Sequence, residues 1–318
     1  MTSVDEKFMN ELCDRVNGSL FRPTPNPKVG CLIVKDGIEI GFGIHKEAGG
    51  PHAEVIAGEM AGENLEGATV YVTLEPCSHF GRTAPCADYL ISKKVAKVVF
   101  AINDETNASG GAEKIQAAGI EVVSNVGAEA ARRTLAPWLH FQIEKLPYVR
   151  LKFAKTKDGY IAKDDGSSKW ISGDESRELV HRLRAQSDAV LVGTKTAIVD
   201  LPKLDARISG VEVQPQGFVM GESEIGRTAD HLHHLKTREP LVALQQLAQA
   251  GIQSVLLEGG AVIGQAFLDA GLVHEIWVFE SQTEFGSGIA APRLDLAQWK
   301  VQKQQRIGGD TLTVYVPA

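Results

Sequence analysis

Apolar residues recur along the chain with two different periods, and the alternation between these periods outlines the fold. Phe8, Met9, Leu12 and Val16 recur at helical spacing, so we expect an amphipathic helix over residues 5–18. The apolar run VGCLIV that follows predicts a buried strand, and KDG predicts a turn into a second strand, IEIGFGIH. The fold is therefore expected to begin with a helix and a hairpin.

After this hairpin, helix and strand patterns take turns. The helical patterns are AEVIAGEMAG, CADYLISKK, AEKIQAAG and GAEAARRTLAPWLHFQIEK, and the strand patterns are ATVYVTL, AKVVFAI and IEVV. Strands that alternate with helices imply a sheet covered on its faces, which is the α/β class. Pro147 precedes a new strand pattern, YVRLKFA, and places a domain boundary at 144–148. Because 318 residues exceed what one core usually serves, we expect two domains, 1–146 and 147–318.

The second half repeats the α/β alternation with its own elements. Its helical patterns are ESRELVHRLRAQS, PLVALQQLAQAG and AVIGQAFLDAG, and its strand patterns are DAVLVG, IQSVLLEGG and VHEIWVFE. Residues 205–235 are the least regular, with one short strand expected at GFVMG. Both halves are therefore expected to contain a sheet with helices packed on it.

Composition and charge narrow the class of protein. The chain is 43% hydrophobic and 23% charged, and it contains no apolar run of about 18 residues that would span a bilayer. Its start, MTSVDEKFMNELCDRV, is acidic and lacks a continuous apolar run, which predicts no secretory signal and a cytoplasmic protein. A formal net charge of -7 argues against duplex nucleic acid as the main partner, because phosphate binding depends on Lys and Arg. A local basic pocket for one small phosphate is left open.

Candidate chemistry begins with two Pro-Cys pairs in TLEPCSHFGRTAPCADYLI. In the reducing cytoplasm, paired cysteines such as Cys77 and Cys86 are more often metal ligands or reactive thiols than a disulfide. GGPHAEV supplies His52 and Glu54, and we expect Pro51 in the first turn of the helix that carries them. A catalytic zinc site needs three protein ligands and an open fourth position. His52, Cys77 and Cys86 supply the three ligands.

Zinc at this set of ligands would lower the pKa of a bound water from about 16 toward roughly 7, which gives hydroxide at neutral pH. Glu54 is then placed to carry protons from this water to a leaving group. Cys77 follows the carboxyl end of a strand and Cys86 begins a helix, where backbone N–H groups stabilise a thiolate. Each of these residues alone would more often be structural. Together they are typical of zinc deaminases of nucleobases, although the second cysteine of such enzymes usually follows three residues after the first.

The remaining cysteines and one histidine have simpler interpretations. Cys13, on a predicted helix, and Cys31, inside an apolar strand, are expected in the core. His79 lies between the two cysteine ligands, where a substrate contact or a loop role fits better than a metal ligand. An alternative from another class is a zinc-stabilised binding protein, which the open fourth position and Glu54 disfavour.

Several stretches, in the same order, resemble the bifunctional riboflavin-biosynthesis family called RibD; they are TPNPKVGCLIV, GGPHAEVIA, VTLEPCSHFGRTAPCADYLI, KFAKTKDGYIA, SSKWISG and LRAQSDAVLVGTKTAIVD. This family joins a cytidine-deaminase-like three-layer domain to a dihydrofolate-reductase-like α/β domain. The resemblance implies zinc-dependent hydrolytic removal of the 2-amino group from 2,5-diamino-6-ribosylamino-4(3H)-pyrimidinone 5′-phosphate, followed by NADPH reduction of the ribosyl chain to ribityl. It also implies a homo-oligomer.

The resemblance also implies roles for individual residues. Asn26 in PNPKVG would hold the substrate, although a turn Asn between two prolines explains this residue equally well. The other implied substrate residues are Ser168, Arg184, Leu204, Arg207 and Glu258. The implied cofactor residues are Lys152, Ala154, Trp170, Thr196, Asp200, Gly260, Ala261, Val262, Ile263 and Gly264.

Physical arguments support some of these roles. Arg184 and Arg207 would clamp a phosphate, because guanidinium groups match phosphate geometry. Trp170 offers a flat surface to a cofactor. Gly259 and Gly260 precede a helix, where backbone can approach a pyrophosphate closely.

The second half departs from the family pattern at several places. Leu201 in VDLPKLDAR replaces the second of two aspartates, and VMGESEIGR lacks the serine expected at a strand end. The segment before PLVALQQLAQAG is shorter than usual, and ESQTEFG replaces a lysine-containing loop. These departures leave two alternatives: a deaminase whose degenerate reductase domain acts as a scaffold, or a zinc deaminase of another small nucleotide.

Overall fold

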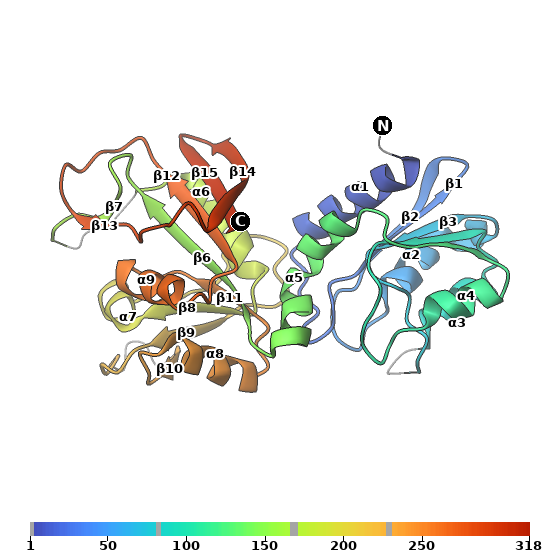
Figure 1. Ribbon diagram of the computed structural model, residues 1–318, viewed down its shortest axis with the longest axis horizontal. Helices are drawn as coiled ribbons and strands as arrows, with labels where there is room; N and C mark the ends of the chain where they lie inside the picture. Colours follow the sequence, from blue (N-terminus) through green and yellow to red (C-terminus); the bar gives the residue numbers. More distant parts are fainter. Residues whose placement is uncertain (1–2, 81–83, 166–170, 227–230) are drawn as a thin grey trace. The chain divides into compact units, whose positions relative to one another are not determined.

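The computed structural model describes residues 3–80, 84–165, 171–226 and 231–318. Ser168 and Trp170, which the sequence places in the second site, lie outside the described residues. The chain divides into two compact units, Met1–Leu139 and His140–Ala318, each with its own main sheet (Figure 1).

A five-stranded sheet with the order β2-β1-β3-β4-β5 forms the centre of the first unit. Its strands are β1 (Gly30–Lys35), β2 (Ile38–Ile44), β3 (Thr69–Val72), β4 (Lys97–Phe100) and β5 (Glu121–Val123). The β1 strand pairs antiparallel with β2 and β3, whereas β3, β4 and β5 run parallel. The helices are α1 (Val4–Gly18), α2 (Ala53–Ala61), the 3-10 helix η1 (Gly62–Leu65), α3 (Cys86–Ser92), α4 (Gly111–Ala117) and α5 (Ala128–Glu144).

Helices cover both faces of this sheet (Figure 1). Leu32 and Val99 point from the strands into a cluster with α1 and α5. Cys31 and Phe100, their neighbours in the chain, pack on the opposite face with α2, α3 and α4. This alternation follows from the two-residue period of a strand. The cysteines Cys13 and Cys31 are fully buried, which confirms their expected core positions.

The second unit contains an eight-stranded sheet with the order β10-β9-β8-β11-β6-β12-β15-β14 and a small β13-β7 pair. Its strands are β6 (Tyr148–Lys155), β7 (Tyr160–Ala162), β8 (Ala189–Gly193), β9 (Gln216–Met220), β10 (His233–Leu235), β11 (Ser254–Leu257), β12 (Glu275–Glu280), β13 (Ile289–Ala290), β14 (Trp299–Ile307) and β15 (Asp310–Pro317). The strands from β10 to β12 are parallel, and β15 and β14 add an antiparallel edge.

Helices also cover both faces of the larger sheet. They are α6 (Asp174–Ala185), α7 (Thr194–Asp200), α8 (Pro240–Gln249) and α9 (Ala261–Asp269). Leu244 of α8 and Phe267 of α9 pack into one cluster with the strands. Leu183 of α6 and Ala197 of α7 pack into a cluster on the other face. Both units are therefore three-layer α/β structures, as the alternating sequence patterns predict.

The structure differs from the sequence prediction in some elements. The short helix α7 and the strands β7, β10, β13, β14 and β15 were not predicted. The expectation that Pro51 lies in the first helical turn is wrong, because α2 begins at Ala53 and His52 is its N-cap. The Pro51 carbonyl is instead hydrogen-bonded by the His45 ring, at 2.9 Å from Nδ1.

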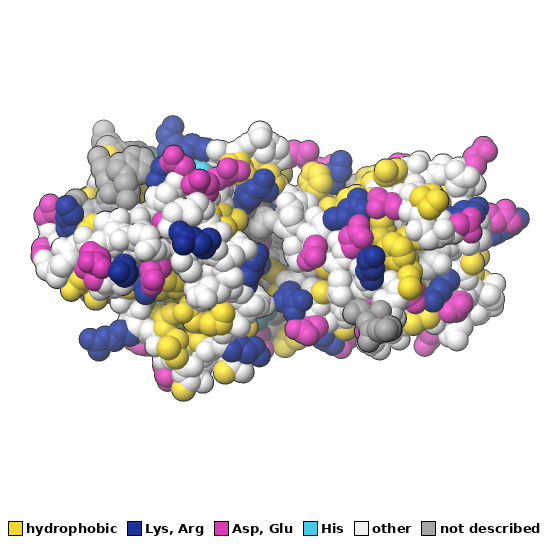
Figure 2. Space-filling view, turned by 90° about the horizontal axis from the view of Figure 1, so that it is seen from above, with side chains coloured by type: hydrophobic (Ala, Val, Ile, Leu, Met, Phe, Trp, Pro, Cys, Tyr) yellow, Lys and Arg dark blue, Asp and Glu magenta, His cyan; other side chains and the backbone are white. Residues whose placement is uncertain are grey.

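Two general properties concern the surface and the helices. Within the described residues, no helix is both long and apolar enough to cross a bilayer. On the face shown in Figure 2, Lys and Arg side chains are interspersed with Asp and Glu side chains. The described residues of this face therefore form no continuous basic surface of the kind that nucleic acids bind.

Candidate functional site

Three potential metal ligands meet in the first unit. His52 caps the N-terminus of α2, Cys86 is the first residue of α3, and Cys77 lies in the segment between β3 and α3. His52 Nδ1 is 3.2 Å from Cys86 Sγ and 3.6 Å from Cys77 Sγ. All three ligand atoms lie within 4.8 Å of one another. The fold thus gathers residues that are up to 34 positions apart in the sequence.

This geometry fits a zinc ion. Tetrahedral zinc has Zn–S and Zn–N distances of about 2.3 and 2.0 Å, which set a sulfur and a nitrogen ligand roughly 3.5 Å apart. The two measured nitrogen–sulfur distances, 3.2 and 3.6 Å, lie close to this value. Cys77 and Cys86 are free thiols rather than a disulfide. His79 is exposed and does not belong to the cluster among the described residues.

The two thiols differ in acidity. The Cys86 backbone N–H donates to Cys77 Sγ over 3.3 Å. Hydrogen bonding from Cys86, aided by His52, lowers the pKa of the Cys77 thiol to about 4. Hydrogen bonding to Cys77, burial and the nearby Glu54 carboxylate together raise the pKa of Cys86. Cys77 is therefore the preformed thiolate of the pair, which suits a metal ligand.

Glu54 lies beside these ligands and is almost fully buried, with 3% of its surface exposed. Burial, the largest cause, raises the pKa of its carboxyl group above the ordinary value. A raised pKa brings a carboxyl group closer to neutrality, where it can both accept and donate a proton. This arrangement suits the proton carrier that the sequence predicts.

A bridge formed by His45 links Asn26 to the loop that carries His52. His45 Nδ1 lies 2.9 Å from the Pro51 carbonyl oxygen, so this nitrogen carries the proton and donates. His45 Nε2 must then accept, and the Asn26 side-chain amide donates to it over 3.0 Å. This assignment leaves the Asn26 carbonyl oxygen for another partner. His45 was not predicted as a functional residue, because its only signal in the sequence is its place at the end of a predicted strand.

A cavity of about 1040 Å³ occupies the second unit. Its lining includes most of the second-half residues that the sequence singles out: Lys152, Ala154, Arg184, Thr196, Asp200, Leu204, Arg207, Glu258, Gly260, Ala261, Val262 and Ile263. Gly264 is an exception. It is buried, and a Cβ atom added there would point at Pro292 and Leu151 rather than into the cavity. His181, one turn before Arg184 on α6, also lines the cavity and was not predicted from the sequence.

The charged groups of this cavity are paired differently from the sequence prediction. Arg184 forms a bidentate salt bridge with Glu258, with Nε–Oε1 and Nη2–Oε2 distances of 2.6 and 3.0 Å. Arg207 is exposed and pairs with Asp205. The Arg184–Glu258 pair was not predicted from the sequence, and it gives the largely buried guanidinium the carboxylate partner that it needs. The Arg184–Arg207 clamp on a phosphate stays a prediction.

Burial also changes the acidity of groups in this cavity. Burial lowers the pKa of Lys152, with Glu258 opposing this shift. Burial alone would raise the pKa of Glu258, but Arg184 and Lys152 lower it below its ordinary value. The pKa of Asp200 is raised by burial. Shifted groups of this kind in a cavity are common where a ligand is bound and transformed.

The N-terminus of α9 offers a close approach to backbone. Gly260 is its N-cap, and a Cβ atom added there would meet no atom within 4 Å. A Cβ atom added at Gly259 would instead lie 1.9 Å from Ile263 Cγ2. Open space over Gly260 and unpaired N–H groups at the helix start fit the pyrophosphate of a dinucleotide.

Comparisons with known proteins agree with both sites. Residues 2–102 match the cytidine and deoxycytidylate deaminase zinc-binding region, and residues 147–313 match the RibD C-terminal domain. The riboflavin biosynthesis protein RibD of Mycobacterium tuberculosis is 39% identical over 317 residues, which cover 94% of this chain and 92% of the relative. The RibD protein of Escherichia coli is 34% identical over 360 residues, covering 96% and 97%.

A solved structure is similar over the whole chain. The diaminohydroxyphosphoribosylaminopyrimidine deaminase/5-amino-6-(5-phosphoribosylamino)uracil reductase of Thermotoga maritima has a TM-score of 0.87 and 34% identity, with 99% of both chains covered. The match over 147–313 does not favour a degenerate second domain. The chain belongs to the RibD family of riboflavin-biosynthesis proteins, and it combines a zinc-dependent deaminase domain with an NADPH-dependent reductase domain.

Proposed function

We propose that residues 1–146 deaminate 2,5-diamino-6-ribosylamino-4(3H)-pyrimidinone 5′-phosphate and that residues 147–318 then reduce its ribosyl chain. The observation that carries the first step is the buried Glu54 carboxyl beside the His52, Cys77 and Cys86 cluster. The two activities of the Thermotoga maritima relative, a diaminohydroxyphosphoribosylaminopyrimidine deaminase and a 5-amino-6-(5-phosphoribosylamino)uracil reductase, support the choice of substrates.

In the deaminase step, His52, Cys77 and Cys86 would hold zinc. Zinc bound there supplies Lewis-acid activation of a water molecule. Glu54 accepts a proton from the attacking water and delivers it to the departing amino group. The carbon gains a C–O bond and loses its C–N bond, and ammonia leaves. Asn26, held by His45, presents its carbonyl oxygen to the pyrimidine.

In the reductase step, NADPH bound in the cavity of the second unit would supply a hydride to C1′ of the ribosyl group. The bond from C1′ to the ring oxygen would break, and this oxygen would take a proton, which gives the ribityl chain. The backbone at Gly260, Ala261, Val262 and Ile263 would hold the cofactor pyrophosphate, and Lys152, Ala154, Thr196 and Asp200 would contact the rest of the cofactor. Arg207, exposed at the cavity edge, contacts the substrate phosphate, while Arg184 and Glu258 act as a pair. Ser168 and Trp170 keep their proposed substrate and cofactor roles.

Glu54→Gln tests this assignment because it removes the proton carrier with little change in volume. We expect the rate of ammonia release to fall by roughly 10²- to 10⁴-fold, the usual contribution of general acid–base catalysis. Bound zinc stays at the wild-type level, and the variant still oxidises NADPH when given the deaminated intermediate. Glu59→Gln is the matched control, since Glu59 is exposed on the same helix and should behave as wild type.

Each half of the proposal has its own contrary outcome. Full ammonia release in Glu54→Gln would exclude Glu54 as the proton carrier. Loss of zinc together with activity would instead identify Glu54 as a ligand. Absence of NADPH oxidation by wild-type protein, with ammonia release intact, would contradict the reductase assignment.

We also propose a cytoplasmic location and a homo-oligomer. The four free cysteines support a reducing compartment. Fluorescent tagging and analytical ultracentrifugation check these two points.

A further inference from the structure

A turn formed by residues 201–207 has an unfavourable backbone conformation. Leu201 has φ 44° and ψ 51°, and Leu204 has φ 56°. Among the described non-glycine residues with positive φ, these two are the apolar ones. The left-handed region disfavours bulky side chains, whereas Asp and Asn tolerate it better. Leu201 stands where the family motif has an aspartate, so this chain carries strain at that position.

This turn forms part of the wall of the reductase cavity. Pro202, Leu204 and Arg207 line the cavity. The Leu204 side chain is 2% exposed and packs in a cluster with Val190 and Val219. The backbone conformation of the turn therefore determines the positions of Pro202, Leu204 and Arg207 in the cavity wall.

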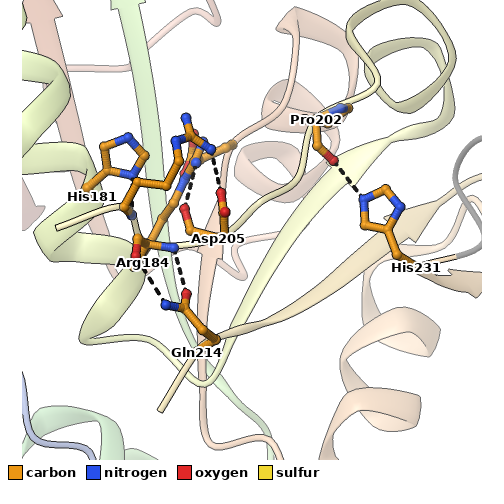
Figure 3. A network of polar contacts seen from close by, with 9 residues as sticks. His181, Arg184, Pro202, Asp205, Gln214 and His231 are labelled. Atoms are coloured by element: carbon orange, nitrogen blue, oxygen red, sulfur yellow. Dashed lines mark hydrogen bonds and ion pairs between the residues drawn. The ribbon is translucent and has the colours of Figure 1, made fainter. Parts of the chain in front are cut away.

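Side chains from other segments bind the backbone of the turn, as Figure 3 shows. The Ala206 N–H donates to Gln214 Oε1 over 2.8 Å, and Gln214 Nε2 donates to the Ala206 carbonyl over 3.2 Å. Arg184 Nη1 donates to the Asp205 carbonyl over 3.0 Å. The turn belongs to no helix or strand, so these contacts replace the backbone partners that regular structure would supply.

Two histidines also form hydrogen bonds with the backbone of the turn. The Arg207 N–H donates to His181 Nδ1 over 3.2 Å, and His231 Nε2 donates to the Pro202 carbonyl over 3.1 Å (Figure 3). A strained conformation persists only where its surroundings hold it in place. The side-chain contacts at 202, 205, 206 and 207 provide that restraint.

Gln214 differs from the other residues that hold the turn. It is exposed and is not part of the cavity lining, whereas Arg184 and His181 line the cavity. The two hydrogen bonds from Gln214 to Ala206 therefore reach the cavity wall through the turn. We propose that Gln214 is a positioning residue of the reductase, which holds the strained 201–207 turn so that Leu204 and Arg207 face the substrate. This inference rests on the proposed substrate role of those two residues.

Gln214→Ala removes both side-chain contacts to Ala206 without creating a core cavity. Two hydrogen bonds contribute modestly, so we expect the KM for the deaminated pyrimidine to rise about 3- to 10-fold. The kcat for NADPH oxidation and the rate of ammonia release should stay within about twofold of wild type. Gln214→Glu keeps the acceptor for the Ala206 N–H and should restore part of the affinity.

Gln216→Ala is the matched control. Gln216 is exposed two residues later, and its side chain makes no hydrogen bond within the described residues. This variant should keep the wild-type KM. An unchanged KM in Gln214→Ala, or an equal rise in both variants, would overturn the proposal.

Leu201→Asn tests the link to strain, because Asn tolerates the left-handed conformation. In this background the turn needs less restraint, so Gln214→Ala should raise the KM by less than about twofold. An undiminished effect would show that Gln214 acts independently of the strain at Leu201, contrary to the proposal.

Amide hydrogen exchange separates failure of this inference from failure of the proposed function. The Ala206 amide is bonded to Gln214, so its exchange should accelerate by roughly tenfold or more in Gln214→Ala, whatever the enzyme's activity. Wild-type protein that fails to oxidise NADPH would contradict the proposed function alone. Unchanged exchange at Ala206 would contradict the positioning role alone.

Discussion

His274 is a half-buried histidine that the fold keeps neutral. Its Nδ1 accepts a hydrogen bond from the Val149 N–H at 3.0 Å, and its ring lies 4.0 Å from that of His140 and 4.8 Å from that of Tyr148. Burial, followed by repulsion from His140, lowers the pKa of His274 to about 4. The other charged groups around this cluster are the Arg150–Glu275 pair and Glu144, which faces His140.

This lowered pKa makes the stability of the second unit depend on pH. An unfolded histidine has a pKa of about 6.5, so below that value protons bind the unfolded chain more tightly than the folded one. The contribution of His274 to the free energy of unfolding should therefore be constant above about pH 7 and fall by about 2 kcal/mol at pH 5. Urea unfolding at pH 7.5 and pH 5.0 measures this loss.

His274→Asn removes the titrating group while its side-chain oxygen can still accept from the Val149 N–H. This variant should lose the part of the pH dependence that His274 causes. His233→Asn, a change at an exposed histidine on β10, should keep the wild-type profile. If His274→Asn lost as much stability between pH 7.5 and pH 5.0 as wild type, another group would be responsible.

At the residue scale, the sequence predicts the metal ligands better than it predicts which side chains form hydrogen bonds and ion pairs with one another. His52, Cys77, Cys86 and Glu54 were identified by type and spacing, because few chemistries need that combination. The pairing of Arg184 with Glu258 was not foreseen, since these residues are 74 positions apart and only the fold brings them together. The His45 bridge was missed for the same reason.

At the scale of single elements, two glycines of β2 allow α2 to pack directly on the sheet. A Cβ atom added at Gly43 would lie 2.3 Å from the Ala53 carbonyl oxygen, and one added at Gly41 would lie 2.2 Å from the Ala57 carbonyl oxygen. Helix and strand are thus in contact through their backbones. Because α2 carries Glu54 and has His52 as its N-cap, this contact fixes the distance of these two residues from the sheet.

Gly43→Ala should push α2 away from β2. We expect a loss of about 1–3 kcal/mol in the free energy of unfolding, as is usual for overpacking. We also expect zinc affinity to fall roughly tenfold or more, since displaced support of a ligand commonly has that effect. Competition with a coloured zinc chelator measures the affinity.

Gly18→Ala is the control. A Cβ atom added at Gly18 would meet nothing within 4 Å, so this variant should not weaken zinc binding. Unchanged zinc affinity in Gly43→Ala would show that α2 is not held by this contact.

The elements that the sequence predicted are those with a strong period or a continuous apolar run. All five strands of the first unit belong to this kind. By contrast, β14 is exposed along most of its length, so its residues KVQKQQR show no alternation between buried and exposed positions. The helix α7 has seven residues and one buried side chain, which is too little for a periodic pattern. Such elements depend on their neighbours in the fold rather than on local sequence.

At the scale of the whole molecule, the two activities are assigned to separate units. The candidate zinc ligands belong to Met1–Leu139, and the lining of the large cavity belongs to His140–Ala318. Each unit has its own sheet and its own hydrophobic clusters. Chemical perturbation of one site should therefore leave the other site intact.

Removal of zinc tests this independence. After dialysis against 1,10-phenanthroline, ammonia release should be lost, because His52, Cys77 and Cys86 alone leave water without Lewis-acid activation. NADPH oxidation with added deaminated intermediate should stay within about twofold of the untreated protein, as expected for sites that belong to separate units and share no residue. Dialysis against the non-chelating 1,7-phenanthroline is the control, and added zinc should restore ammonia release. A parallel loss of both activities, recovered together by zinc, would instead mean that the metal stabilises the second unit as well as the first.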